Sequence, residues 1–265
     1  MAVWPGAFSE KPVTAFLLKI LQFGLRVGQK ALKLSICFIF FLLNRFRFQK
    51  LCANICGVPT FRKVCLPVLL YVIRHGQTDW NAEGRFQGQT DIPLNETGRG
   101  QATQNGALLA AVLGDTTSHY DFIASPLGRT RETMERLRAQ MQLDPTAYQL
   151  DDRLKEICFG DWEGSTTEEL RKQFPDRVKQ RSRGKWDFLA PGEHAESYEI
   201  LSWRTGAWLA ALKRPTVAVT HGGVIRSFFR LIGNIAPDHA CSMHIPQDRV
   251  LKIDLEQRQL QWLTA

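Results

Sequence analysis

The run Val-Leu-Leu-Tyr-Val-Ile at residues 68–73 carries no charged side chain and one polar atom, the Tyr71 hydroxyl. Such a short and apolar run is typical of a β-strand that is covered on both faces. Arg74, His75 and Gly76 follow it directly. A charged residue and a glycine can simply mark the turn after a strand, because short motifs have real false-positive rates. Whether Arg74, His75 and Gly76 also have a functional role depends on the motifs in the rest of the chain.

From residue 67 onward, strand-like and helix-like segments alternate. Strands are expected at 68–73, 120–124 and 216–220, with a closing hairpin at 249–263. Apolar residues at helical spacing and suitable cap residues predict helices at 94–114, 128–141, 166–174, 196–213 and 222–233. This alternation predicts an α/β fold, a three-layer sandwich with a mainly parallel central sheet and helices on both faces.

The net charge of +8 is concentrated ahead of this predicted domain. Residues 1–70 carry ten Lys and Arg and a single acid, Glu10, whereas the other 195 residues carry 24 basic and 25 acidic side chains. The predicted domain is therefore nearly neutral. Its composition gives no support for a nucleic-acid partner.

Residues 1–66 form a basic extension that we expect to lie outside the fold, with the domain spanning residues 67–265. Its longest apolar run, residues 36–43, is too short to cross a bilayer, although residues 16–34 have the spacing of an interfacial amphipathic helix. The favoured interpretation is a mis-assigned start of the chain. A membrane-surface helix and a targeting segment are the alternatives, so membrane contact through residues 1–66 is a minor hypothesis.

The six cysteines do not form a recognisable disulfide or zinc pattern. Only Cys158 and Cys241 lie in the predicted domain, and no Cys-x-x-Cys pair occurs. Reduced thiols in a reducing compartment are the simplest account, which favours a cytoplasmic protein without a bound metal.

Three of the predicted strands end in residues that can bind an anion. Arg74 and His75 follow the first strand, Ser125 and then Arg129 follow the second, and His221 follows the third. Ligands collect at the carboxyl ends of strands in open α/β sheets, so the two histidines and the two arginines should converge. Arginine forks and imidazoles around one point suit a doubly charged anion, and phosphate is the obvious candidate.

Glycines accompany these strand ends at Gly76 and at Gly222-Gly223. They would let the backbone approach a ligand, and the helix that starts after His221 would favour an anion at its N-terminus. A histidine in such a site can act as a nucleophile.

A phosphate site also needs a proton for the leaving group, and residues 154–164 supply three candidate carboxyls: Glu156, Asp161 and Glu163. Glu156 precedes an apolar pair, where partial burial could raise its pKa toward neutrality. A surface carboxylate at the end of a strand would look identical, so this alternative stays open.

Four segments, RHGQTDWN, ASPLGRTRET, LKEICFGDWEG and VTHGG, occur in this order along the chain. Together they resemble the histidine phosphatase superfamily, the phosphoglycerate mutase-like proteins, and the resemblance covers about residues 67–255. It implies phosphoryl transfer through a phosphohistidine, without a metal or another cofactor.

The resemblance also implies a role for each motif residue. His75 would be the nucleophile that attacks phosphorus, and Glu156 would protonate the leaving oxygen and then activate the water that frees the enzyme. The groups that would bind the phosphoryl oxygens are Arg74, Asn81, Arg129, His221 and the backbone of Gly222.

Within this family the chain is more similar to phosphatases than to mutases. Mutases usually carry a longer insertion after the acid–base glutamate, and only 39 residues lie here between Glu156 and Glu196. We therefore expect a phosphomonoesterase that acts on a small phosphorylated metabolite. A phosphoglycerate mutase is the main alternative, and a phospho-ligand binding module without turnover is the weaker one.

The remaining polar and aromatic residues are expected to have structural roles. The turn at residues 191–197 departs from the family's usual form, which leaves open whether Glu193 or Glu196-Ser197 fills that position. The basic segment 171–188 could cap an acidic substrate or could be a solvated helix face. Loop, surface or packing positions are expected for Thr78, Trp80, Trp162, Trp186, His119, His194, His239 and His244.

Overall fold

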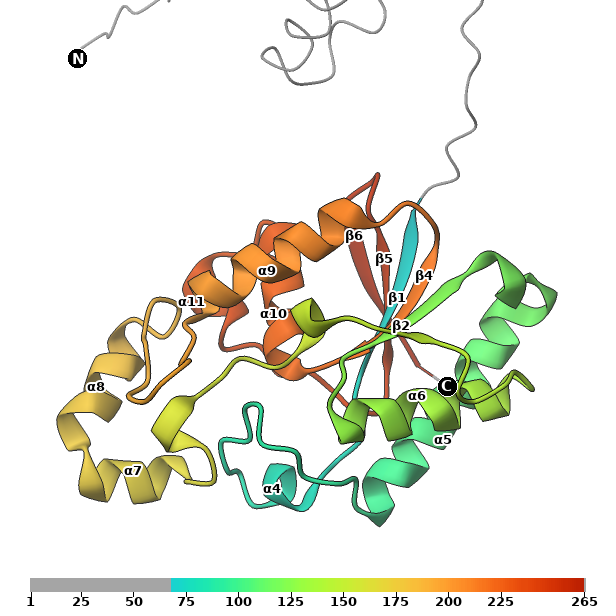
Figure 1. Cartoon of the computed structure of the whole chain (residues 1–265). Coiled ribbons are helices and arrows are strands. Elements are labelled where there is room, and N and C mark those ends of the chain that lie inside the picture. The colour runs from blue at the N-terminus through green and yellow to red at the C-terminus, as the bar shows by residue number, and fades with distance from the viewer. Residues whose placement is uncertain (1–67, 265) are drawn as a thin grey trace, which may run out of the picture. The chain divides into compact units, whose positions relative to one another are not determined.

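The computed structural model describes residues 68–264, which build a six-stranded sheet between two layers of helices (Figure 1). The strand order is β3-β2-β4-β1-β5-β6. The first four of these strands in the order are parallel, whereas β5 pairs antiparallel with β1 on one side and with β6 on the other. The strands are β1 (Leu69–Arg74), β2 (Asp121–Ala124), β3 (Gln149–Leu150), β4 (Thr216–Thr220), β5 (Val250–Asp254) and β6 (Gln259–Leu263).

The two central strands, β1 and β4, are buried on both faces. All five residues of β4 and the four inner residues of β1 are buried, because helices cover the sheet from both sides. In the parallel register Arg74 of β1 lies beside Thr220 of β4, so both strands end at the same level. The residues that follow, His75 and His221, therefore start side by side.

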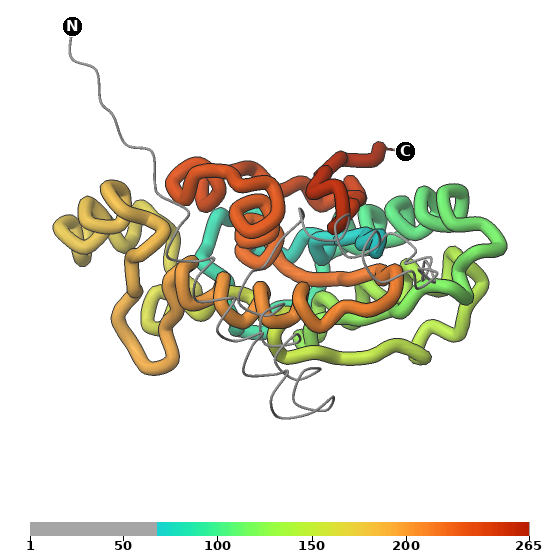
Figure 2. Tube along the Cα trace, turned by 90° about the horizontal axis from the view of Figure 1, so that it is seen from above, coloured from blue at the N-terminus to red at the C-terminus, as the bar shows by residue number. Residues whose placement is uncertain are grey.

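Helices α5 and α6 cover one face of the sheet, and α9 and α10 cover the other (Figure 1). Figure 2 shows that α7 and α8 lie at one end of this sandwich, away from the α5–α6 pair. The helices are α4 (Asp79–Ala82), α5 (Glu96–Leu113), α6 (Gly128–Gln140), α7 (Thr167–Gln173), α8 (Pro175–Arg183), α9 (Tyr198–Ala211), α10 (Gly222–Leu231) and α11 (Pro237–Ala240). Short 3₁₀ turns are η1 (Gly114–His119), η2 (Asp152–Leu154) and η3 (Gly160–Trp162).

A separate apolar cluster fills each side of the sheet. Trp208 of α9 stacks on Phe228 of α10 in the first cluster, and Met134 and Leu137 of α6 pack in the second. A third cluster, built around Trp162 and Leu170, lies beneath α7 and α8. Large, fully buried apolar side chains in each cluster supply the main driving force for folding.

The predicted α/β sandwich with a mainly parallel sheet is confirmed. Asn95, Thr166 and Ser197 accept hydrogen bonds from the first turns of α5, α7 and α9 and so cap these helices. The closing hairpin is β5 and β6. The four histidines expected at the surface, His119, His194, His239 and His244, are all exposed.

The role expected for Gly76 needs correction. A Cβ atom at Gly76 would lie 2.2 Å from the Gly98 carbonyl oxygen, and a Cβ at Gly98 would lie 2.1 Å from the Gln77 carbonyl oxygen. Glycine is required at both positions because the loop after β1 packs directly on the first turn of α5. Gly76 thus anchors the loop, and the close backbone approach is to a helix.

Two further predictions concern cysteines and the N-terminal extension. Cys158 and Cys241, the two cysteines in the described part of the chain, are free thiols. No helix within residues 68–264 is long and apolar enough to cross a membrane. The predictions for residues 1–66 lie outside the described residues.

Candidate active site

The carboxyl ends of β1, β2 and β4 bring together the histidines and arginines that the sequence singled out. His75 follows β1 and His221 follows β4, and their ring centroids lie 5.1 Å apart with the rings edge to face. Arg129 lies in the first turn of α6, directly after β2. His75, Arg129 and His221 are all at least 98% buried.

The surroundings of His75 leave one ring nitrogen available. Its Nδ1 lies 2.8 Å from the Gly76 carbonyl oxygen, which can only accept, so Nδ1 carries the proton. The backbone N–H of His75 donates to the Thr220 carbonyl on β4. Ring and backbone are therefore both fixed, and Nε2 keeps its lone pair, as a nucleophile requires.

His221 is fixed by a side chain that the sequence analysis did not assign to the site. Its Nε2 lies 2.8 Å from the Ser125 hydroxyl at the end of β2, and Ser125 is fully buried. His221 also stands at the N-cap of α10, where no side chain caps the helix. The pairing with Ser125 links the ends of β2 and β4 across the site.

The two arginines are each anchored at one side of the guanidinium. Arg74 donates from Nη1 to the Ile245 carbonyl at 2.8 Å. Arg129 donates from Nη1 to Thr90 and from Nη2 to Gly88, both at the backbone carbonyl. These bonds fix the planes of both guanidinium groups and leave the Nε hydrogens of both unused.

Unsatisfied polar atoms concentrate at this point. Among residues 68–264, six buried side-chain nitrogens or oxygens lack a hydrogen-bond partner, and three of them belong to the residues just described: Arg74 Nε, Arg129 Nε and His221 Nδ1. A buried donor without a partner is destabilising by about 1–3 kcal/mol. Three unpartnered atoms around His75 form a site that an anion with several oxygens would complete.

The electrostatic surroundings keep both histidines neutral. Burial lowers the pKa of His75 well below its usual value of 6.5, and the charges of Arg129 and Arg74 lower it further. Burial and the same arginines lower the pKa of His221 as well. Burial also lowers the pKa of Arg74 to about 10 and that of Arg129 to about 10, so both stay charged near neutral pH.

Glu156 reaches the site from the loop after η2. Its two carboxylate oxygens accept the backbone N–H of Gly223 at 3.0 and 3.1 Å, in the first turn of α10. A Cβ atom at Gly223 would lie 2.2 Å from Glu156 Oε1, so glycine here makes room for the carboxylate rather than for a ligand. Of the other two candidate carboxyls, Asp161 is exposed and remote from these contacts.

Glu163, the third candidate, joins two loops. Its carboxylate accepts hydrogen bonds from the backbone of Gln89, Thr90 and Phe159 and from the Thr90 hydroxyl. The loop at residues 88–90 is the one whose carbonyls hold Arg129. Glu163 thus supports the position of Arg129 through this loop, a role that depends on a long-range contact and carries no local sequence signal.

Asn81 lies beside the site in a network of side-chain amides. Its Nδ2 donates to Gln87 Oε1, and its Oδ1 accepts from Gln247 Nε2. Gln247 also donates to the His75 carbonyl, so the network supports the backbone of His75. Thr78 caps α4 and holds this loop, as expected of it.

Of the two carboxylates in the turn at residues 191–197, Glu196 makes the internal contacts. Glu196 accepts a hydrogen bond from the Cys158 backbone N–H and pairs with Arg204 at 2.8 Å, whereas Glu193 is exposed. Arg204 also donates to the Glu156 carbonyl. Glu196 therefore braces the loop that carries Glu156. Trp162 and Trp186 are buried packing residues.

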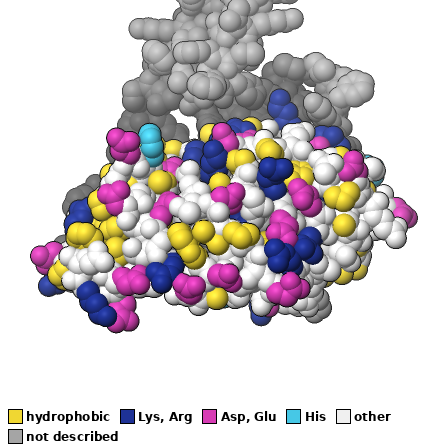
Figure 3. All heavy atoms as spheres, turned by 60° about the horizontal axis from the view of Figure 1, so that its bottom comes forward, with side chains coloured by type: hydrophobic (Ala, Val, Ile, Leu, Met, Phe, Trp, Pro, Cys, Tyr) yellow, Lys and Arg dark blue, Asp and Glu magenta, His cyan; other side chains and the backbone are white. Residues whose placement is uncertain are grey.

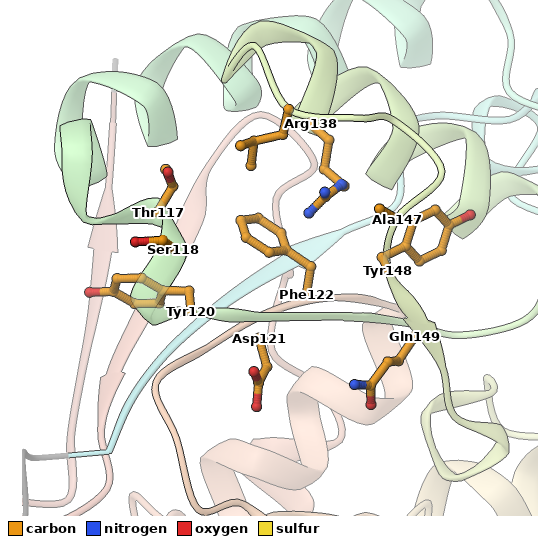
Figure 4. Close-up of a pocket in the computed structure, with 10 residues that line it drawn as sticks. Thr117, Ser118, Tyr120, Asp121, Phe122, Arg138, Ala147, Tyr148 and Gln149 are labelled. Atoms are coloured by element: carbon orange, nitrogen blue, oxygen red, sulfur yellow. The ribbon is translucent and has the colours of Figure 1, made fainter.

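Two other kinds of site, a metal site and a cavity away from the histidines, can be considered within the described residues. No group of three or more His, Cys, Asp or Glu within residues 68–264 could hold a metal ion. A cavity of about 460 Å³ lies beside Phe122 of β2, with the Arg138 guanidinium above the Phe122 ring (Figure 4). None of the residues assigned above lines this cavity.

The face at the bottom of Figure 1 shows mixed charge. Lys and Arg alternate there with Asp and Glu, with apolar groups between them (Figure 3). This view shows no broad field of one sign. The positive charge that matters for the site is that of the buried arginines.

Comparison with known proteins places this geometry in a family. The model of the histidine phosphatase superfamily (branch 1) matches residues 70–265, almost the whole described part of the chain. The chain belongs to the histidine phosphatase superfamily. It is a histidine phosphatase enzyme with the phosphoglycerate mutase-like fold.

Three relatives illustrate the range of the family. The chain is 38% identical over 107 residues to the uncharacterized phosphatase PhoE of Bacillus subtilis, covering 40% of this chain and 51% of that one. It is 33% identical over 202 residues to the probable phosphoglycerate mutase GpmB of Salmonella paratyphi C, covering 74% and 88%. The structure of mycobacterial glucosyl-3-phosphoglycerate phosphatase with VO3 matches with a TM-score of 0.58 and 26% identity, covering 74% and 96%.

Proposed function

We propose that this histidine phosphatase is a metal-independent phosphomonoesterase that acts through a phosphohistidine at His75 on a small phosphorylated metabolite. The observation that carries this proposal is the set of three unpartnered buried donors, Arg74 Nε, Arg129 Nε and His221 Nδ1, around His75. A phosphoryl group brings oxygens that can accept from all three.

The first half of the reaction transfers the phosphoryl group to the enzyme. His75 Nε2 attacks phosphorus, the N–P bond forms, and the bond from phosphorus to the ester oxygen breaks. Arg74, Arg129 and His221 stabilise the charge on the equatorial oxygens. The Glu156 carboxyl gives its proton to the leaving oxygen, so the alcohol departs neutral.

The second half releases phosphate. The Glu156 carboxylate takes a proton from a water molecule as its oxygen attacks phosphorus, and the N–P bond breaks. His75 regains its lone pair and Glu156 its proton. The second amide hydrogen of Asn81 and the Gly222 backbone at the N-terminus of α10 would supplement the phosphate contacts.

A phosphoglycerate mutase is the second candidate, and the resemblance to GpmB favours it. In a mutase the phosphohistidine must outlive the departure of the first product, so water has to be excluded. The segment between Glu156 and Glu196 holds only the short helices α7 and α8. So short a segment gives little protection of a phosphohistidine from water, which supports hydrolysis as the main activity.

The test is phosphate release from a panel of phosphomonoesters that includes 3-phosphoglycerate, in excess EDTA. We expect release by the wild type and by His119→Ala, whose histidine is exposed, and at least a 10³-fold loss in His75→Ala. Faster formation of 2-phosphoglycerate than of phosphate, primed by the bisphosphate, would make the enzyme a mutase. If the protein binds esters but neither hydrolyses them nor forms 2-phosphoglycerate, it is a phospho-ligand binding module.

A further inference from the structure

A second group of cations lies next to the phosphate site and has no assigned role. Arg226 projects from α10, Arg181 from α8, and Lys185 from the segment that follows α8. All three side chains are partly buried. We call Arg181, Lys185 and Arg226 the second cation cluster.

Arg226 connects this cluster to Arg74 of the proposed phosphate site. A Cβ atom at Gly222 would lie 3.4 Å from Arg226 Nη1 and 3.5 Å from Arg74 Nε, so both guanidinium groups flank the same backbone position. Arg74 Nε is one of the unpartnered donors. An anion bound by Arg74 therefore has Arg226 as its neighbour.

Tyr198 links Arg226 to the other two cations. Its hydroxyl accepts a hydrogen bond from Arg226 Nη1 at 3.3 Å, and its ring is almost fully buried. Tyr198, Arg181 and Lys185 line one small cavity together with apolar side chains and Glu196. The Arg181 guanidinium lies over the Phe86 ring, 4.9 Å from its centre. The cluster thus runs continuously from the phosphate site to α8.

The cluster lacks acidic partners. Within residues 68–264, no carboxylate oxygen lies within 4.0 Å of a charged nitrogen of Arg181, Lys185 or Arg226. The nearby Glu196 is already paired with Arg204. Burial, together with the charges of Arg181 and Arg226, lowers the pKa of Lys185 to about 8. Like charges held together without a counter-ion destabilise the protein when no anionic ligand is bound.

An anionic ligand group removes this repulsion. We propose that Arg181, Lys185 and Arg226 bind a second anionic group of the substrate, a carboxylate or a second phosphoryl group, while the first phosphoryl group lies against His75. This inference rests on the proposed function and narrows its substrate class to phosphomonoesters that carry a further negative group. The cavity of about 10 Å³ accommodates one water-sized group, which is the size of a single carboxylate or phosphoryl oxygen.

Equilibrium binding of phosphonates tests this class without depending on turnover. Calorimetry would compare phosphonoacetate, 3-phosphonopropionate and 4-phosphonobutyrate with alkylphosphonates of equal length, and a bisphosphonate series would distinguish a carboxylate subsite from a phosphoryl subsite. We expect the best doubly anionic ligand to bind the wild type at least tenfold more tightly than its singly substituted counterpart, because charge-assisted hydrogen bonds are the strong ones.

Matched variants on the same segment make the comparison specific. Arg181→Gln and Lys185→Met should each reduce that preference about tenfold. Arg183→Gln and Lys179→Met remove the same charges from exposed positions of α8 and should keep it. A long-range charge effect would lower the preference equally in all four variants.

Each outcome decides the proposal. Three results would overturn it. They are equal affinity of the wild type for the two ligands of each pair, an equal loss of the preference in the control variants, and no binding of any phosphonate. The proposed function is judged separately, by the His75-dependent release of phosphate from p-nitrophenyl phosphate, which carries no second anion. If phosphate is released from that ester but the doubly anionic phosphonates are not preferred, the proposed phosphatase function stands and the proposed second anion subsite is wrong.

Discussion

At the scale of single residues, His75 and His221 differ in the partner that fixes each ring. The Gly76 carbonyl holds the proton on Nδ1 of His75, whereas the Ser125 hydroxyl meets His221 at Nε2. With Ser125 donating to Nε2, the proton of neutral His221 lies on Nδ1, the atom without a partner. One histidine therefore offers a lone pair and the other a donor, which suits attack on a bound phosphoryl group.

Glu156→Gln tests the acid role through the choice of leaving group. The loss of kcat/KM should be about 10²–10⁴-fold for ethyl phosphate, whose alcohol needs a proton to leave. It should be clearly smaller for p-nitrophenyl phosphate, whose phenolate leaves without one. Asp161→Asn, an exposed neighbour, is the control and should keep activity on both esters. Equal losses on the two esters in Glu156→Gln would contradict the role.

The neutral histidines predict loss of stability in acid. Because the folded-state pKa of His75 and of His221 lies well below 6.5, the unfolded chain binds more protons as pH falls below about 6.5. The stabilisation is complete above that pH and should fall by about 2 kcal/mol per histidine between pH 7 and pH 5.

Urea unfolding at several pH values measures this effect. The pH dependence should be about 2 kcal/mol smaller in His221→Gln than in the wild type, whereas His119→Gln, at an exposed position, should match the wild type. An unchanged slope in His221→Gln would mean that His221 is protonated in the folded protein.

The sequence identified the histidines and arginines of this site, but not the side-chain contacts that hold them in place. Arg74, His75 and His221 come directly after apolar runs, so the parallel-sheet rule brings them together. The Ser125 partner of His221 and the bracing role of Glu163 arise only when loops distant in sequence meet. Nothing local distinguishes these residues from ordinary turn residues.

At the scale of elements, the loop after β1 is held by close packing on α5. Gly76 and Gly98 allow the two backbones to touch, and the Asn95 cap starts α5 at this level. The loop that carries His75 is thus positioned by a helix on the opposite layer from α10. Any side chain at residue 98 has to push the two elements apart.

Gly98→Ala and Gly100→Ala make a matched pair within α5. The added methyl at residue 98 meets the Gln77 backbone and should destabilise the fold by about 1–3 kcal/mol while lowering phosphatase activity. The methyl at residue 100 meets nothing within 4 Å and should stabilise the helix by about 0.5–1 kcal/mol with activity retained. Thermal unfolding and phosphate release measure both effects. Equal behaviour of the two variants would contradict the packing argument.

The helices with an apolar face could be predicted from the sequence, including the short helix α7 expected at 166–174, whereas α8 and the shortest elements were not predicted. Apolar spacing and caps located α5, α6, α9 and α10, because each buries a continuous face against the sheet. The two-residue strand β3 and the four-residue helices α4 and α11 are set by tertiary contacts. In the basic segment 171–188, α8 is largely exposed, whereas Arg181 and Lys185 are partly buried and belong to the second cation cluster.

At the scale of the whole molecule, the sheet assembles one site from distant parts of the sequence. His75 and His221 are 146 positions apart, and Arg129 and Glu156 come from segments between them. Two apolar clusters on opposite faces hold the strands in register. The family relationship and the site geometry therefore depend on the same feature, the common carboxyl edge of β1, β2 and β4.

The central claim is a covalent phosphoryl group on His75, and trapping it is the most direct measurement. The enzyme would be mixed with a labelled phosphomonoester, quenched within milliseconds in base, and digested for mass spectrometry. The account predicts a phosphate on the peptide that contains His75, stable in base, lost in acid, and absent from His75→Ala. Turnover in the wild type with no phosphorylated His75 peptide, or phosphate on another residue, would contradict it.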